Sequence, residues 1–235
     1  NKIGEKEQGA EAWHPDAKID ESAKCGVITT RFTRKHAWEG TALFTKSFTY
    51  EKNEGKRVFL EVERARDLKA ELNGISVPEY KKGTLSTPYV FEVTDYIGKE
   101  NRLTFISSNL YESLPKDAIK FSSAATNETQ TNWNGLLGKI ELREENNTFI
   151  KSVRVLPKST TIDVFLEIDS LQERSCNIKV KSSVIEGSYE KACSLSKGIN
   201  EIVFCDIALK PDAAKWDEYE GNLQTLTVLC DEAET

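Results

Sequence analysis

The sequence predicts an all-β protein that is built from two domains. Short stretches with alternating apolar and polar residues recur along most of the chain, and clusters of Gly, Pro, Asn and Lys separate them. No stretch has the apolar spacing of a helix longer than two turns. A polar interruption divides the strand-like stretches into two series. The 235 residues suffice for two all-β domains, each with a core of its own.

The first series predicts antiparallel strands that are joined by short turns. Val58 and Leu60 fall on the same face of the run 57–64, which is the pattern of a strand with one buried face. Asn73-Gly74 separates two short runs, and this dipeptide favours a type I′ hairpin turn because both residues tolerate positive φ. The expected strand regions are 41–50, 57–64, 69–77, 88–94, 102–107 and 136–143.

The second series begins after the polar residues 144–147, so we expect domains at 1–146 and 147–235. Ile162 and Val164 alternate with Asp163 in a run typical of a sandwich strand. Several short strands with turns between them predict an immunoglobulin-like β-sandwich. The expected strands are 149–157, 160–170, 177–184, 200–209 and 222–230.

Composition excludes several classes of partner. The net charge of -6 gives no cationic field for nucleic acid or for an anionic membrane surface. No run approaches the roughly 20 apolar residues of a membrane span, and the first residues lack the apolar core of a signal peptide. The sequence has no Met, even at position 1, so we expect that it was excised from a longer chain.

The cysteines and histidines predict neither a metal site nor a cofactor. The five cysteines form no CxxC pair, and only His14 and His36 could add imidazole ligands. Cys193 and Cys205 lie in strand-like runs, where a reduced thiol acts as a small apolar side chain. Reduced thiols favour a cytoplasmic location over a periplasmic or extracellular one.

No arrangement of residues predicts a self-contained enzyme. Glu61 and Glu63 share the polar face of the strand 57–64, where carboxylates are commonly solvated. His14 and His36 accompany no G-x-S-x-G or Cys nucleophile motif, and no Gly-rich phosphate loop precedes a helix. We therefore assign no catalytic residue.

The segment 110–134 differs from the rest because it is long, polar and without alternation. Loops of this length within a compact domain are commonly functional. An indole ring can stack on a pyranose, and side-chain amides can bond to its hydroxyl groups, so the segment predicts a carbohydrate contact. Equally, Trp133 could close the edge of the sandwich while the amides bond to loop backbone, and both interpretations stay open. The candidate contact residues are Glu128, Gln130, Asn132, Trp133 and Asn134. Trp13, Trp38 and Trp216 fit core or interface positions better.

Several segments resemble the amino-terminal domains of family 2 glycoside hydrolases, the family of β-galactosidases and β-glucuronidases. They follow one another in the order of the family. The matching segments are 55–77, 84–97, 98–105, 129–143, 153–157 and 216–228.

The resemblance implies a galactose-binding-like jelly roll followed by an immunoglobulin-like sandwich. In the family these precede a (β/α)₈ barrel in which two glutamates perform retaining hydrolysis, and no barrel follows in this sequence. We expect a non-catalytic portion of a β-galactosidase-like hydrolase, inactive alone, whose partners are its own carboxyl-terminal barrel and a β-galactoside or related glycoside. Asn132, Trp133 and Asn134 would lie near the barrel entrance. The alternative is a free-standing carbohydrate-binding module.

Overall fold

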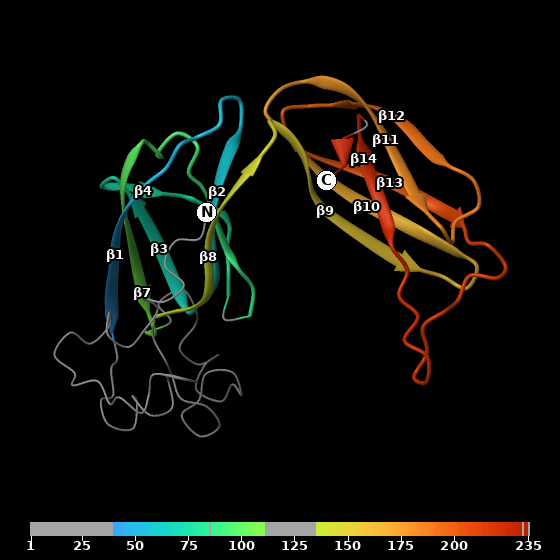
Figure 1. Cartoon of the computed structure of the whole chain (residues 1–235), viewed down its shortest axis with the longest axis horizontal. Coiled ribbons are helices and arrows are strands. Elements are labelled where there is room, and N and C mark those ends of the chain that lie inside the picture. Colours follow the sequence, from blue (N-terminus) through green and yellow to red (C-terminus); the bar gives the residue numbers. More distant parts are fainter. Residues whose placement is uncertain (1–39, 85, 111–134, 232, 235) are drawn as a thin grey trace. The chain divides into compact units, whose positions relative to one another are not determined.

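The computed structural model describes residues 40–84, 86–110, 135–231 and 233–234. The chain divides into two compact units, 1–144 and 145–235. Each unit contains two sheets, and strands with a defined register run antiparallel to their neighbours (Figure 1). The described residues form strands, turns and loops without a helix, so the predicted all-β class is confirmed.

The first unit is a sandwich of two four-stranded sheets. One sheet has the order β1-β7-β3-β4 and the other the order β5-β6-β2-β8. Its strands are β1 (Thr41–Thr49), β2 (Arg57–Ala65), β3 (Asp67–Leu72), β4 (Ile75–Val77), β5 (Glu79–Lys81), β6 (Tyr89–Glu92), β7 (Glu100–Ser108) and β8 (Leu136–Glu145). β7 and β8 belong to different sheets, so the segment 111–134 connects one layer to the other.

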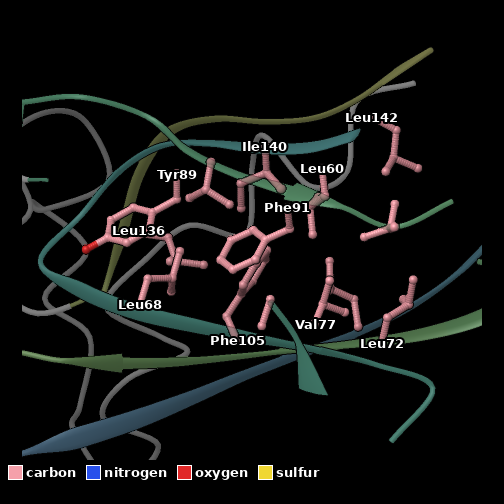
Figure 2. Close-up of a cluster of buried hydrophobic side chains, with 14 of the residues drawn as sticks. Leu60, Leu68, Leu72, Val77, Tyr89, Phe91, Phe105, Leu136, Ile140 and Leu142 are labelled. Carbon is pink, nitrogen blue, oxygen red and sulfur yellow. The ribbon is translucent and has the colours of Figure 1, made fainter. Parts of the chain in front are cut away.

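The alternation in the sequence places one face of each strand in the core of this unit. Figure 2 shows side chains from both sheets meeting between the layers, among them Leu60 and Phe91 from one sheet and Leu72 and Phe105 from the other. Phe91 is completely buried. Full burial of such a side chain contributes about 1.5–3 kcal/mol relative to exposure, so this core stabilises the unit.

The turn at Asn73-Gly74 has the predicted conformation. Asn73 has φ 56° and Gly74 has φ 80°, as a type I′ turn requires. The side chain of Asn73 also fixes the neighbouring strand, because its Oδ1 accepts a hydrogen bond from the Arg102 amide at 2.8 Å. The turn therefore sets the β3–β4 register, in which Leu72 lies opposite Ile75.

The second unit also contains two sheets around one core. They have the orders β13-β10-β9 and β12-β11-β14-β15. The strands are β9 (Thr148–Pro157), β10 (Thr161–Ser170), β11 (Arg174–Ser182), β12 (Tyr189–Leu195), β13 (Gly198–Ala208), β14 (Leu226–Cys230) and β15 (Ala233–Glu234). Val164 and Ile168 from one sheet and Ile178 and Val180 from the other are completely buried in this core.

The second unit differs from the sequence predictions in the loop before β14 and at Trp216. Strand β14 begins at Leu226 instead of residue 222, because the side chains of Asn222 and Gln224 bond to the carbonyl oxygens of Lys215 and Ala214, at 3.1 and 2.9 Å. These contacts hold the preceding residues in a loop. Trp216 is 65% exposed, so the structure does not place it in the core of this unit.

Candidate functional site

The two ends of the segment 111–134 are held together at one end of the first sandwich. Ser107, near the end of β7, donates a hydrogen bond from its hydroxyl to the carbonyl oxygen of Gly135 at 3.5 Å. Gly135 directly precedes β8. The segment therefore leaves and re-enters the sandwich at the same place.

Asn109 fixes the point where the segment begins. It is 2% exposed, and its Oδ1 accepts a hydrogen bond from the Gly40 amide at 3.0 Å, while its own amide donates to the Gly40 carbonyl at 3.4 Å. The Leu110 amide donates to Ser108 Oγ at 3.2 Å. Buried polar groups in proteins are nearly always hydrogen-bonded. These contacts therefore fix the backbone just before the segment.

A cavity of about 350 Å³ opens beside this anchor. Strand β4 pairs only with residues 70–72 of β3, so it ends before the level of Asp67 and leaves room at the edge of the sheet. Both sheets of the first unit contribute to the walls. The lining residues are Thr41, Asp67, Leu68, Lys69, Glu79, Lys82, Tyr89, Ile106 and Ser108.

Tyr89 contributes a rigid aromatic wall to the cavity. Its ring is 2% exposed and stacks on Phe91 with 6.4 Å between ring centroids, and its hydroxyl donates a hydrogen bond to the carbonyl oxygen of Arg66. Burial, with the nearby negative charges of Asp67 and Glu79, raises the pKa of Tyr89 to about 12. The phenol is therefore neutral at physiological pH and acts as a hydrogen-bond donor.

A buried arginine lies directly before the cavity in the sequence. Arg66 is 3% exposed, and burial lowers the pKa of its guanidinium to about 10. Even so, the group stays protonated at neutral pH. Arg66 itself does not line the cavity, whose charged lining groups are the ammonium groups of Lys69 and Lys82 and the carboxylates of Asp67 and Glu79.

This combination suits a polar, uncharged ligand with several hydroxyl groups. Hydroxyl groups, ammonium groups and carboxylates offer both donors and acceptors, while Leu68, Tyr89 and Ile106 give apolar surface. The charges of the two lysines and two acids balance, so the wall has no preference for one sign of ligand. The cavity can therefore bind by hydrogen bonding and contact, and it supplies no evident nucleophile.

The five residues predicted from the sequence to contact a sugar lie outside the described residues. These are Glu128, Gln130, Asn132, Trp133 and Asn134. The structure describes both flanks of their segment: Leu110 bonds to Ser108, which lines the cavity, and Gly135 bonds to Ser107, the residue before Ser108.

Sequence reasoning missed the lining residues of the cavity. Glu79 begins the short strand β5 and Lys82 directly follows it, in a Lys-rich region where no alternation marks a strand. The sequence around Asp67 did not indicate a binding site either, because a single acidic residue before a strand is common. The turn residue Pro78 was the available hint that the chain changes sheets between β4 and β5.

Glu61 and Glu63 take part in structural contacts on the outer face of their sheet. Glu61 lies 4.0 Å from Arg143, and Glu63 Oε2 accepts a hydrogen bond from the Lys139 amide at 2.8 Å. Their side chains are 39% and 38% exposed. The carboxylate of Glu63 also fills the space where a side chain at Gly138 would lie. These contacts agree with the solvated-face interpretation of both residues.

Within the ranges that the structure describes, no group of three or more His, Cys, Asp or Glu side chains could hold a metal ion. The same part of the chain contains no helix that is long and apolar enough to cross a membrane.

Comparison with known proteins reveals a shared fold. No protein-family model matches the sequence. No curated protein matches it significantly either. Among solved structures, a β-D-mannosidase from Dictyoglomus thermophilum matches 83% of this chain with a TM-score of 0.62 and 16% identity, over 28% of its own length. A GH2 β-galacturonidase from Eisenbergiella tayi matches 85% with a TM-score of 0.66 and 14% identity, over 35% of its length.

A calcium-binding mutant of β-glucuronidase 2 from Bacteroides uniformis matches the full chain, with a TM-score of 0.67 and 16% identity, over 31% of its own length. At such identities the likeness shows the fold alone. The fold of this chain is thus one that glycoside hydrolases of family 2 contain, and the chain spans about a third of the length of these enzymes.

Proposed function

We propose that this chain is the non-catalytic amino-terminal portion of a glycoside hydrolase that acts on O-glycosyl bonds in carbohydrate metabolism. Its activity would be β-galactosidase-like, and the catalytic barrel of the same polypeptide would be its partner. The proposal rests on how much of each chain takes part in the structural match. Solved glycoside hydrolases match 83–100% of this chain, yet the match occupies only 28–35% of their own length.

In this proposal the first unit supplies scaffold and contacts at the rim of the substrate site. The segment 111–134 starts and ends beside a polar cavity, and it carries Asn132, Trp133 and Asn134. Anchoring both ends of a long segment lowers the entropy cost of presenting its side chains to a ligand. A hydrolase would use such a segment to orient the sugar while the barrel performs the chemistry.

An activity assay tests the non-catalytic part of the proposal. The purified chain is incubated with nitrophenyl β-galactoside and nitrophenyl β-glucuronide, and the release of nitrophenol is measured against a blank. We expect no release above the blank. Release well above it would require a catalytic carboxylate pair within these 235 residues.

A second candidate function is that of a free-standing carbohydrate-binding module. The cavity favours it, because a site of about 350 Å³ with balanced donors and acceptors could hold a sugar without any barrel. Calorimetry with galactose, lactose and glucuronate separates the two candidates. Millimolar or tighter binding that Trp133→Ala abolishes supports the module, and the absence of heat with all three sugars supports the scaffold. Trp216→Ala is the matched control, because Trp216 is an exposed indole of the second unit.

A further inference from the structure

Three thiols gather in the second unit, on neighbouring strands of one sheet. Cys176 on β11 lies directly opposite Cys193 on β12. On the other side of β11, Cys230 on β14 lies opposite Ile178, which is two residues from Cys176 on the same face of β11. Cys176 is therefore the middle member, with a cysteine neighbour on each side.

The three side chains face the same interior. Cys176 is 6% exposed and belongs to the core of the unit, and the half-buried Cys193 and Cys230 pack against that core. The fourth described cysteine, Cys205 on β13, is exposed. All four are free thiols.

The spacing of the strands suits a disulfide at Cys176. Directly opposite residues of antiparallel strands have Cα atoms about 4.5–5.5 Å apart, and disulfides span Cα distances of about 4.4–6.8 Å. Cys193 meets this condition because it is opposite Cys176 in the register. Cys230 lies diagonally across from Cys176, because its direct partner in the register is Ile178. Cys193 is therefore the better-placed partner of Cys176, and Cys230 is the second neighbour.

The two outer thiols give reagents access to the buried one. Cys193 donates a weak hydrogen bond to the Lys191 carbonyl at 3.6 Å, and it is half-buried. Burial raises the pKa of Cys230, and the hydrogen bond from Cys176 opposes that rise. Burial raises the pKa of Cys176 to about 12, so this thiol is the least reactive towards reagents in solution. A buried thiol such as Cys176 therefore reacts with the sulfur of a neighbouring cysteine sooner than with a reagent in solution.

We infer that Cys176 is the shared member of an internal disulfide, which it forms with Cys193 or Cys230 when the chain meets a low-molecular-weight disulfide such as oxidised glutathione. The thiolate of the outer cysteine attacks oxidised glutathione, forms a mixed disulfide and releases one glutathione thiolate. The thiolate of Cys176 then attacks the protein sulfur of that mixed disulfide and releases the second glutathione. The two protons of the protein thiols end on the two glutathione molecules, so the protein loses two electrons and oxidised glutathione gains them.

The disulfide would join β11 to a neighbouring strand of its sheet. Because a cross-link restricts the unfolded chain, it raises the thermal midpoint of the second unit, by roughly 10–25 °C for a typical disulfide in a unit of this size. The site is independent of the proposed sugar contacts, which lie in the first unit.

The test uses the whole chain carrying Cys25→Ser, which removes the one cysteine outside the described residues. The folded protein is incubated with oxidised glutathione, denatured in excess N-ethylmaleimide, digested without reduction and analysed by mass spectrometry. We expect a peptide pair that links Cys176 to Cys193 or to Cys230. We also expect the rise in thermal midpoint, and its loss on addition of dithiothreitol.

Cys205→Ser is the matched control, because it removes an exposed thiol from the same unit. This variant should keep both the linked peptides and the rise in midpoint, whereas Cys176→Ser should lose both. Cys176→Ala serves if the serine variant does not fold. The inference is overturned if Cys176 of the oxidised protein is recovered fully alkylated, or if the disulfide joins Cys193 to Cys230.

Discussion

The phenol of Tyr50 donates a hydrogen bond of 2.5 Å to Glu144 Oε1, which ties the end of β1 to the end of β8. The same carboxylate accepts hydrogen bonds from the amide and the side chain of Asn53. The Tyr50 contact, followed by the one from Asn53, lowers the pKa of Glu144. Burial and the same contact raise the pKa of Tyr50. This carboxylate holds the edge of the first unit together in its ionised form.

The Glu144 contact makes part of the stability depend on pH. Because the folded pKa lies below the ordinary value of 4.5, the contribution is fully present above about pH 4.5 and is lost as the pH falls through the lowered pKa. Urea unfolding should show Glu144→Gln to be less stable than wild type by about 1 kcal/mol at pH 7, with a smaller difference at pH 3. Glu54→Gln, in the exposed loop next to Asn53, should match wild type at both pH values. Equal stability of Glu144→Gln and wild type at pH 7 would contradict the prediction.

The second prediction concerns the hairpin turn. Gly74 has φ 80°, where a side chain strains the backbone, so Gly74→Ala should destabilise the chain by about 1 kcal/mol. The space around Gly74 is open, so the cost comes from backbone conformation and not from a collision. Thermal or urea unfolding measures the effect. Gly98→Ala is the control, since a Cβ there makes only an ordinary contact at 3.8 Å, and a larger loss in the control than in Gly74→Ala would refute the account.

The third prediction concerns a buried arginine. Arg57 is 3% exposed and forms two hydrogen bonds of 2.8 Å with Glu92, and its guanidinium lies 5.1 Å from the centre of the Phe59 ring. Removing the charge of Glu92 weakens both charge-assisted hydrogen bonds to the buried guanidinium, so Glu92→Gln should cost about 2–3 kcal/mol in urea unfolding. Glu61→Gln is the control in the same sheet. Because Glu61 is exposed and 4.0 Å from Arg143, its loss should cost less than about 1 kcal/mol.

Much of the fold could be predicted because the strands with one buried face carry alternating sequences. Strands β2 and β10 were predicted in this way, and the turn at Asn73-Gly74 was predicted from its dipeptide alone. Strand β12 was indicated only by the strand-like run around Cys193 and was not among the expected strands. It is an edge strand in which Leu195 alone is fully buried, so its sequence lacks the apolar alternation.

The sites were harder to predict because they depend on pairing between strands. Because β12 was not among the expected strands, its register with β11 could not be predicted. The sequence therefore did not show that Cys193 lies opposite Cys176. The cavity presents a similar difficulty, because Asp67 and Glu79 lie on strands of different sheets. The spacing of these residues in the sequence does not reveal that they line one cavity.

The fourth prediction tests the rim role of the segment 111–134 in the full-length enzyme. Each of Asn132→Ala and Asn134→Ala removes a side chain that could bond to substrate hydroxyl groups, so kcat/KM should fall about 5–10-fold, through a higher KM or a lower kcat. The thermal midpoint should stay unchanged. Asn222→Ala, in an exposed loop of the second unit, is the control and should keep wild-type kinetics. An unchanged kcat/KM in both rim variants would show that the two side chains do not contribute to substrate binding or catalysis.

The central proposal is tested most directly by the coding sequence downstream of Thr235. This sequence is obtained by sequencing the transcript of the protein. We expect the reading frame to continue into alternating strands and helices of a (β/α)₈ barrel with two catalytic glutamates. A reading frame that stops shortly after Thr235, or that continues into a domain without such a barrel, would contradict the assignment of this chain to a glycoside hydrolase.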